Sequence, residues 1–103
     1  MSNPTLPDAK QLRAIGHKLR PAVTVAGNGL SEAVLAELER ALADHELVKV
    51  RLAVGSREAR AETADAICRA TGAALVQRIG NVILIVRRSG DPDPKLSNLI
   101  RPL

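Results

Sequence analysis

The chain has no phenylalanine, tyrosine or tryptophan among its 103 residues. Modules that bind single-stranded nucleic acid by base stacking, such as RRM sheets and OB folds, need aromatic side chains as platforms. The composition therefore excludes these modules. We therefore expect any contact with a nucleic acid to use phosphate groups, backbone amides and the planes of arginine side chains.

Thiols and imidazoles are scarce as well, with one cysteine and two histidines in the whole chain. Cys68 cannot form an internal disulfide and has no second thiol with which to bind a metal. Its neighbours Ala64 and Ile67 favour a small buried side chain over a reactive thiol. His17 and His45 lie far apart in the sequence and form no zinc-binding pattern. We therefore expect neither a metal site nor a cofactor.

Long apolar runs are also missing, because no stretch approaches the roughly 20 residues that a membrane-spanning helix needs. Residues 1–5 contain no basic segment followed by an apolar core, so we expect no secretory signal. Both observations predict a cytoplasmic protein that makes no membrane contact.

The apolar content of 46% is enough to build the core of one domain. The formal net charge of +4 indicates a mild preference for polyanions. This charge is unevenly distributed, since residues 31–46 carry −4 whereas residues 1–30 and 47–60 carry +3 each. We expect a surface with an acidic side and a basic side.

Hydrophobic periodicity and the positions of glycine and proline define the secondary structure. Asp8 can cap the first helix, and Pro21 prevents its extension. Residues 82–86 are apolar at every position, which indicates a central strand, and Gly80 and Asn81 form a hairpin turn. The predicted elements are helix 9–19, strand 22–25, helix 32–43, strand 47–54, helix 57–71, strand 73–79 and strand 82–87.

Two strand-helix-strand crossovers followed by a hairpin give an α/β fold with the element order α-β-α-β-α-β-β. We expect a two-layer sandwich in which helices pack on a four-stranded mixed sheet. Residues 6–88 would form the domain, and residues 1–5 and 89–103 would be flexible tails.

The loop between the first strand and the second helix has the features of an anion site. Gly27 and Gly29 remove side-chain bulk, so the loop backbone can come close to a ligand. Ser31 is a good N-cap, and the free N–H groups of the first helical turn attract phosphate. A tight strand-to-helix turn without a ligand would use the same residues.

Two nucleotide-binding motifs are excluded at this loop. A Rossmann fingerprint would need a third glycine where Glu32 stands, and a P-loop would need a lysine in place of Leu30. No pairing of a nucleophile with a base is evident elsewhere. We therefore do not expect an enzyme.

Basic residues recur around the loop. Lys49 and Arg51 alternate with apolar residues and so point to one side of their strand. Arg57 and Arg60 lie in the first turns of the third helix, where positive charge opposes the helix macrodipole. This position indicates a role other than helix stability. A helical wheel places four residues on the polar face of the first helix: Lys10, Arg13, His17 and Arg20.

Six segments carry a family resemblance: Leu19-Arg20-Pro21, residues 23–32 (VTVAGNGLSE), residues 45–50 (HELVKV), Arg57-Glu58, Thr71-Gly72-Ala73 and residues 79–87 (IGNVILIVR). In this order and with these spacings, they resemble the YhbY-like, bacterial single-domain form of the CRM (chloroplast RNA splicing and ribosome maturation) domain family. The resemblance covers about residues 6–88.

The resemblance implies a fold similar to the C-terminal domain of the third translation initiation factor. It also implies RNA binding, association with precursors of the large ribosomal subunit and no catalytic activity. In the family, a GxxG loop contacts RNA, comparable to the backbone clamp of KH domains. The matching positions are Ala26, Gly27, Asn28 and Gly29, and alanine at the first fits only if its φ is negative. Val86 stands where the family usually has an aromatic residue.

These observations predict a monomeric RNA-binding protein that associates with structured ribosomal RNA or pre-large-subunit particles and assists ribosome assembly. Phosphate contacts would position it, because the sequence shows no base-reading code. The alternative is a protein-interaction module that binds an acidic ribosomal or assembly protein. The residues expected to contact RNA are Lys10, Arg13, His17, Lys18, Arg20, Ala26, Gly27, Asn28, Gly29, Lys49, Arg51, Arg57 and Arg60.

Overall fold

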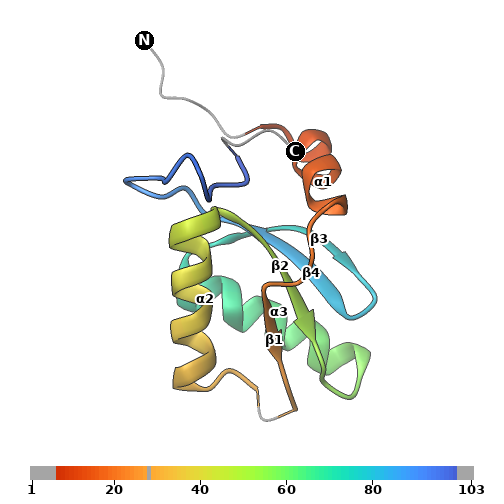
Figure 1. Cartoon of the computed structure of the whole chain (residues 1–103). Helices are drawn as coiled ribbons and strands as arrows, with labels where there is room; N and C mark the ends of the chain where they lie inside the picture. The colour runs from red at the N-terminus through yellow and green to blue at the C-terminus, as the bar shows by residue number, and fades with distance from the viewer. Residues whose placement is uncertain (1–6, 28, 100–103) are drawn as a thin grey trace.

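The helices and strands follow one another in the predicted order (Figure 1). The computed structural model describes residues 7–27 and 29–99, so the predicted tail at residues 1–5 and the loop residue Asn28 lie outside the described residues. The elements are α1 (Ala9–His17), β1 (Val23–Val25), α2 (Glu32–His45), β2 (Leu47–Leu52), α3 (Arg57–Thr71), β3 (Ala74–Ile79) and β4 (Val82–Val86).

Each helix begins at the polar residue that the sequence indicated. Asp8 and Gln11 form a capping box at α1, in which the Asp8 carboxylate accepts the Gln11 N–H at 2.8 Å and the Gln11 side chain accepts the Asp8 N–H at 3.1 Å. Ser31 and Ser56 cap α2 and α3 through their hydroxyl oxygens at 3.2 and 3.0 Å. Helix α1 ends at His17, earlier than predicted, because the next amide donates three residues back in a tighter turn.

The four strands form one mixed sheet in the order β1-β2-β4-β3. Strands β1 and β2 are parallel, whereas β4 runs antiparallel to both of its neighbours, β2 and β3. This arrangement confirms the predicted mixed sheet and the central position of β4. Strands β1 and β3 are the two edges of the sheet.

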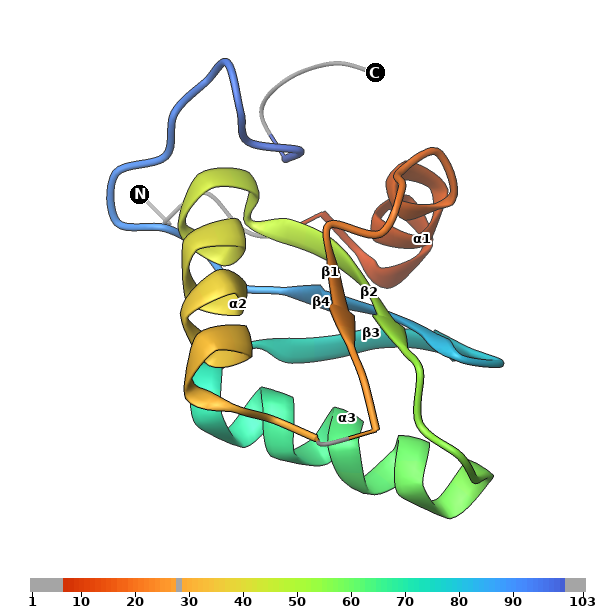
Figure 2. The same cartoon turned by 60° about the horizontal axis from the view of Figure 1, so that its bottom comes forward.

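Helices α2 and α3 cover one face of the sheet and form the second layer of the predicted sandwich (Figure 2). Burial of apolar side chains between these layers supplies the main stabilisation of the fold. We call this cluster the main core; its fully buried members include Val25, Leu38, Leu42, Val50, Leu52, Ile67, Ile83 and Ile85.

A second core lies on the opposite face, where α1 packs across one end of the sheet. It consists of Leu12, Leu47, Leu84 and Val86. Val86 is 3% exposed, so the family position that is usually aromatic is a packing position in this chain. Gly16 makes the close approach of α1 possible, because a Cβ atom there would collide with the Leu84 side chain. Strand β4 is apolar on both faces because it contributes to both cores.

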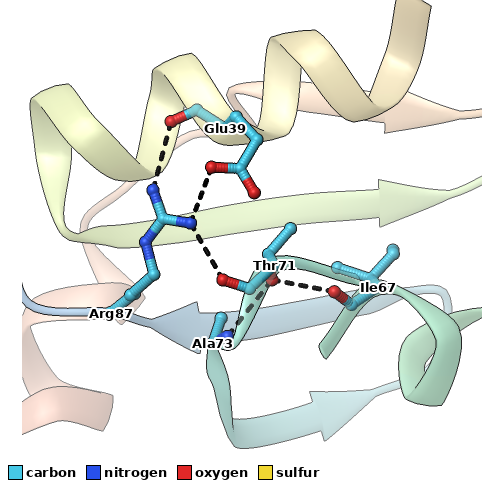
Figure 3. Close-up of polar contacts among 5 residues, drawn as sticks. All are labelled: Glu39, Ile67, Thr71, Ala73 and Arg87. Carbon is cyan, nitrogen blue, oxygen red and sulfur yellow. Dashed lines mark hydrogen bonds and ion pairs between the residues drawn. The ribbon is translucent and has the colours of Figure 1, made fainter. Parts of the chain in front are cut away.

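Arg87, directly after β4, joins the middle of α2 to the C-terminal end of α3 (Figure 3). Its guanidinium donates to the Glu39 carboxylate at 2.8 Å and to the Thr71 carbonyl oxygen at 2.9 Å. The Thr71 hydroxyl in turn donates to the Ile67 carbonyl oxygen at 2.8 Å and accepts the Ala73 N–H at 3.2 Å. This arginine is therefore a structural residue rather than a free basic group.

The segment after β4 differs from the prediction of a flexible tail. It is irregular as expected, but Ser97 and Asn98 are buried against the junction of α2 and β2. The Ser97 hydroxyl donates to the Glu46 carboxylate at 2.6 Å, and the Asn98 amide donates to the Leu47 carbonyl oxygen at 2.7 Å. Leu99 packs on the second core. Residues 100–103 lie outside the described residues.

Candidate nucleic-acid interface

Carboxylates are unevenly distributed over the helices and strands. Helix α2 carries four carboxylates and α3 carries three, whereas α1 and the four strands carry none. The strands contribute three basic residues: Lys49, Arg51 and Arg78. Since α2 and α3 lie on one face of the sheet, the opposite face is basic and lacks a strand carboxylate. The predicted acidic side is therefore limited to α2, because α3 also carries three arginines, Arg57, Arg60 and Arg69.

Helix α1 leaves part of this basic face uncovered. Lys49 and Gln77 are the cross-strand partners of Leu84, which belongs to the second core. Directly opposed residues in a sheet project to the same face. Arg51 and Ile79 flank Val82 in the same way, and Thr24 is the partner of Arg51. We call this region the open sheet face, made of Thr24, Lys49, Arg51, Gln77, Ile79 and Val82.

The basic residues of α1 and the following loop adjoin the open sheet face. His17 and Lys49 line one pocket of about 320 Å³, and Arg20 and Lys49 line a smaller one of about 150 Å³. Lys10, Arg13 and Lys18 are exposed along or just after the same helix. Lys49 therefore connects the predicted basic helix to the sheet.

The loop at residues 26–29 lies at the other end of β1 from α1 (Figures 1 and 2). The basic helix and the loop are therefore separated by the length of β1, although they are close in sequence. Arg51 lies between them, because its partner Thr24 is the middle residue of β1. Lys49 and Arg51 thus form the link between α1 and the loop along the open sheet face.

The backbone of the loop explains which of its positions needs glycine. The Gly29 N–H donates to the Ala26 carbonyl oxygen at 2.9 Å, and this turn places Gly29 at a φ of +81°, which favours glycine. Ala26 has no positive φ, so alanine at the first position of the GxxG pattern causes no backbone strain. Gly27 also has no positive φ, and a Cβ atom there would meet no atom within 4 Å. Within residues 7–27 and 29–99, no packing contact requires glycine at this position.

Arg57 and Arg60 do not lie on the open sheet face, so the residues predicted to contact RNA fall on two surfaces. Together with Arg78 and Gly80 they line a pocket of about 350 Å³. Arg78 is the partner of Ile83, a main-core residue, so it leaves the sheet on the α3 side. Within residues 7–27 and 29–99, none of these three arginines forms a salt bridge.

Sequence reasoning missed Arg78, which has no local signal. It stands two residues before the hairpin turn in an edge strand, and only the register of β3 on β4 brings it to the start of α3. The pocket and the loop lie at the same end of the sheet, because hydrogen bonds join the end of β2 to the end of β1 and to the hairpin turn. The Ala53 N–H donates to the carbonyl oxygen of Val25, the last residue of β1, at 2.7 Å. The Leu52 N–H donates to the carbonyl oxygen of Asn81, in the hairpin turn, at 2.6 Å.

Cys68 and His45 were the other residues considered for metal binding. Burial and the nearby Asp65 charge raise the pKa of the Cys68 thiol, which makes the thiol less reactive at neutral pH. The Nδ1 atom of His45 lies 2.9 Å from the Leu96 carbonyl oxygen. Among the described residues there is no cluster of histidine, cysteine and acidic side chains that could hold a metal ion. In the same part of the chain, no helix has the length and apolar character to cross a membrane.

Comparison with known proteins identifies a family. The model of the CRS1/YhbY (CRM) domain matches residues 6–87. A "probable RNA-binding protein" of Pseudomonas aeruginosa is 50% identical over 92 residues, which cover 89% of this chain and 88% of that protein. An "RNA-binding protein" of Haemophilus influenzae is 47% identical over 78 residues, covering 76% of this chain and 79% of that protein.

A solved structure agrees with the fold. The solution structure of a hypothetical Staphylococcus aureus protein, described there in connection with RNA binding, superposes with a TM-score of 0.72 at 29% sequence identity. The match covers 81% of this chain and 86% of that chain.

Proposed function

Because this chain belongs to the CRS1/YhbY (CRM) domain family, we propose that it is an RNA-binding protein that docks on structured ribosomal RNA. Its relatives in Pseudomonas aeruginosa and Haemophilus influenzae are named for RNA binding. The observation that carries the proposal is the open sheet face, where Lys49 and Arg51 lie on strands that contain no carboxylate. Two like charges on one sheet face repel each other, and a polyanion removes this cost.

RNA phosphates are the groups that these residues fit. Lys49 and Arg51 would hold the RNA backbone on the open sheet face, and the exposed residues Lys10, Arg13, His17, Lys18 and Arg20 would extend the contact toward α1. An RNA segment that reaches the loop as well has to run along β1, because α1 and the loop lie at its two ends (Figure 1).

The loop would contact the RNA backbone through its own backbone. The positions are Ala26, Gly27, Asn28 and Gly29, at the N-terminus of α2, where the helix macrodipole favours negative charge. A Cβ atom at Gly27 would meet no atom of the described residues within 4 Å. Its absence leaves room for a phosphate to come close to the backbone. The pocket of Arg57, Arg60 and Arg78 would take a further phosphate beyond the same end of the sheet.

We also propose a biological setting. The family resemblance points to precursors of the large ribosomal subunit in the cytoplasm, where the protein would act as a monomeric, non-catalytic assembly factor. The proposed contacts between basic residues and RNA phosphates suit this role. Such contacts position a protein on folded RNA and require no catalytic group.

Fluorescence anisotropy of a labelled large-subunit ribosomal RNA fragment tests the proposal. We expect the double variant Lys49→Glu with Arg51→Glu to lose at least about tenfold in affinity, because two attractive contacts become repulsive. The matched control is Arg40→Glu with Arg69→Glu, which changes the net charge equally but on α2 and α3, the helices that cover the other face of the sheet.

Equal affinities of the two double variants would contradict the proposed surface. If purified protein keeps an acidic protein partner after nuclease treatment and has no affinity for the RNA fragment, the function is protein interaction instead.

A further inference from the structure

The largely apolar pocket between α1 and the sheet is not explained by phosphate contacts. It has a volume of about 320 Å³ and lies where α1 meets the open sheet face. Its apolar lining includes Pro21, Ile79, Val82 and Leu84. Ligand pockets usually measure about 300–1,000 Å³ and combine an apolar lining with a few polar groups. This pocket lies at the lower end of that range and suits a small planar group.

Ile79 is the exposed apolar residue of this pocket. It is 65% exposed, more than either of the other large exposed apolar residues, Leu75 and Leu96. Its strand neighbour Val82 continues the apolar surface across to β4. Covering this surface with a flat ring would remove apolar area from water. The lining of Ile79 and Val82 therefore favours a ligand with an apolar face.

Polar groups complete the pocket. Gln77 offers both a hydrogen-bond donor and an acceptor, and Lys49 offers a positive charge. His17 lines the same pocket and has a ring on which a second ring can stack. A ligand with an apolar ring face, hydrogen-bonding groups on the ring edge and an attached phosphate matches all three. A nucleotide within a single-stranded RNA segment has this combination.

We propose that this pocket receives one unstacked nucleobase of the bound RNA, with the base against Ile79 and Val82, its edge at Gln77 and its phosphate at Lys49. The inference rests on the RNA binding proposed above and adds the class of RNA, a segment with at least one unpaired base. In a chain without Phe, Tyr or Trp, aliphatic side chains and an imidazole take the place of an aromatic platform.

Methyl NMR of the full chain gives a direct test. The chain has no Phe, Tyr or Trp, so a large ring-current shift at an isoleucine methyl group reports a nucleobase or a histidine ring. We titrate labelled protein with single-stranded oligoadenylate and oligouridylate, and with inorganic phosphate as a probe that has no ring. We expect the Ile79 methyl signals to shift with at least one oligonucleotide and not with phosphate, and the Leu75 signals to stay in place.

Affinity measurements provide the matched control. Ile79→Ala should lower the affinity for the single-stranded oligonucleotide about fivefold, which is at the low end of the range measured when one base-stacking side chain is removed. The same variant should leave the affinity for a duplex of the same length unchanged. Leu75→Ala should change neither affinity, because Leu75 is an exposed residue of the same strand that does not line the pocket.

Three results would overturn the inference. If RNA binds with a clear salt dependence but the Ile79 signals stay in place, the pocket is not a base site while the proposed function stands. If the wild type binds no RNA, both fail. If the Ile79 signals shift with protein concentration alone, the apolar surface is a contact between two copies of the chain.

Discussion

At the scale of single residues, the loop has one position at which the backbone demands glycine. Gly29 has a φ of +81°, whereas Ala26 and Gly27 have no positive φ. Departure from the GxxG pattern at Ala26 is therefore harmless to the backbone. Gly29 is needed for the turn, whereas among the described residues no atom lies where a Cβ atom of residue 27 would be.

Replacing Gly29 by aspartate should reduce RNA affinity by at least about tenfold, because the carboxylate repels phosphate at the start of α2. Gly29→Asn is the matched control, since asparagine has almost the same shape, tolerates a positive φ and is uncharged. Anisotropy measures both affinities, and circular dichroism checks that both variants fold. Equal affinities would mean that the loop is only a turn.

Gly16→Ala tests the contact of α1 with the sheet. The added Cβ atom collides with the end of the Leu84 side chain, which is 3% exposed and packs in the second core. Overpacking costs about 1–3 kcal/mol, and the better helix propensity of alanine returns up to about 1 kcal/mol. We expect the free energy of unfolding in urea to fall by about 1 kcal/mol. Gly27→Ala, which meets no neighbouring atom, should leave it unchanged; equal losses in both variants would refute the argument.

At the scale of elements, the segment after β4 is part of the folded domain. It attaches to the junction of α2 and β2, where Glu46 is 1% exposed and has a φ of 64°. The two carboxylate oxygens of Glu46 accept the Ser97 hydroxyl and the Ser89 N–H, each at 2.6 Å. A buried carboxylate is stable only with such partners, so the segment and the junction depend on each other.

Ser97→Ala should therefore lower the free energy of unfolding by about 1.5–3 kcal/mol, the contribution of a hydrogen bond to a charged group. The control is Ser89→Ala, because the Ser89 side chain accepts only an exposed backbone N–H and its own N–H still reaches Glu46. Urea unfolding of the two variants decides the point. A loss below about 0.5 kcal/mol for Ser97→Ala would show that the segment is not held by Glu46.

At the scale of the whole molecule, the sheet separates two basic surfaces. The open sheet face with α1 lies on one side, and the pocket of Arg57, Arg60 and Arg78 opens toward α3. Both adjoin the end of the sheet where the loop lies. An RNA that contacts both surfaces has to pass around this end, and each contacted phosphate adds to the salt dependence of binding.

The salt dependence should reveal how many phosphates the arginine pocket holds. Each contact contributes about −0.7 to −0.9 to the slope of log affinity against log salt concentration. Replacing Arg57, Arg60 and Arg78 by alanine should therefore flatten the slope by about 0.7 to 0.9, because the pocket is proposed to hold one phosphate. Arg69→Ala, whose guanidinium already pairs with Asp65, should have little effect. An unchanged slope in the triple variant would exclude the pocket from the RNA contact.

Features that depend on neighbouring residues could be predicted from the sequence. Asp8, Ser31 and Ser56 start helices because a cap needs only an amide three residues away. The alternation at Lys49 and Arg51 assigned them to one face because side chains alternate along any strand. The family resemblance added the expected fold, which the Staphylococcus aureus structure supports.

Contacts between distant residues could not be predicted from the sequence and are seen in the folded chain. Glu46 and Ser97 are 51 positions apart, and no local pattern indicates that the segment after β4 folds back to bury them. Arg78 joins Arg57 and Arg60 through the register of β3 on β4, while the loop and α1, which are close in sequence, are held apart by β1. The physical reason is that local propensity fixes each element, whereas the burial of shared apolar faces fixes how the elements are placed.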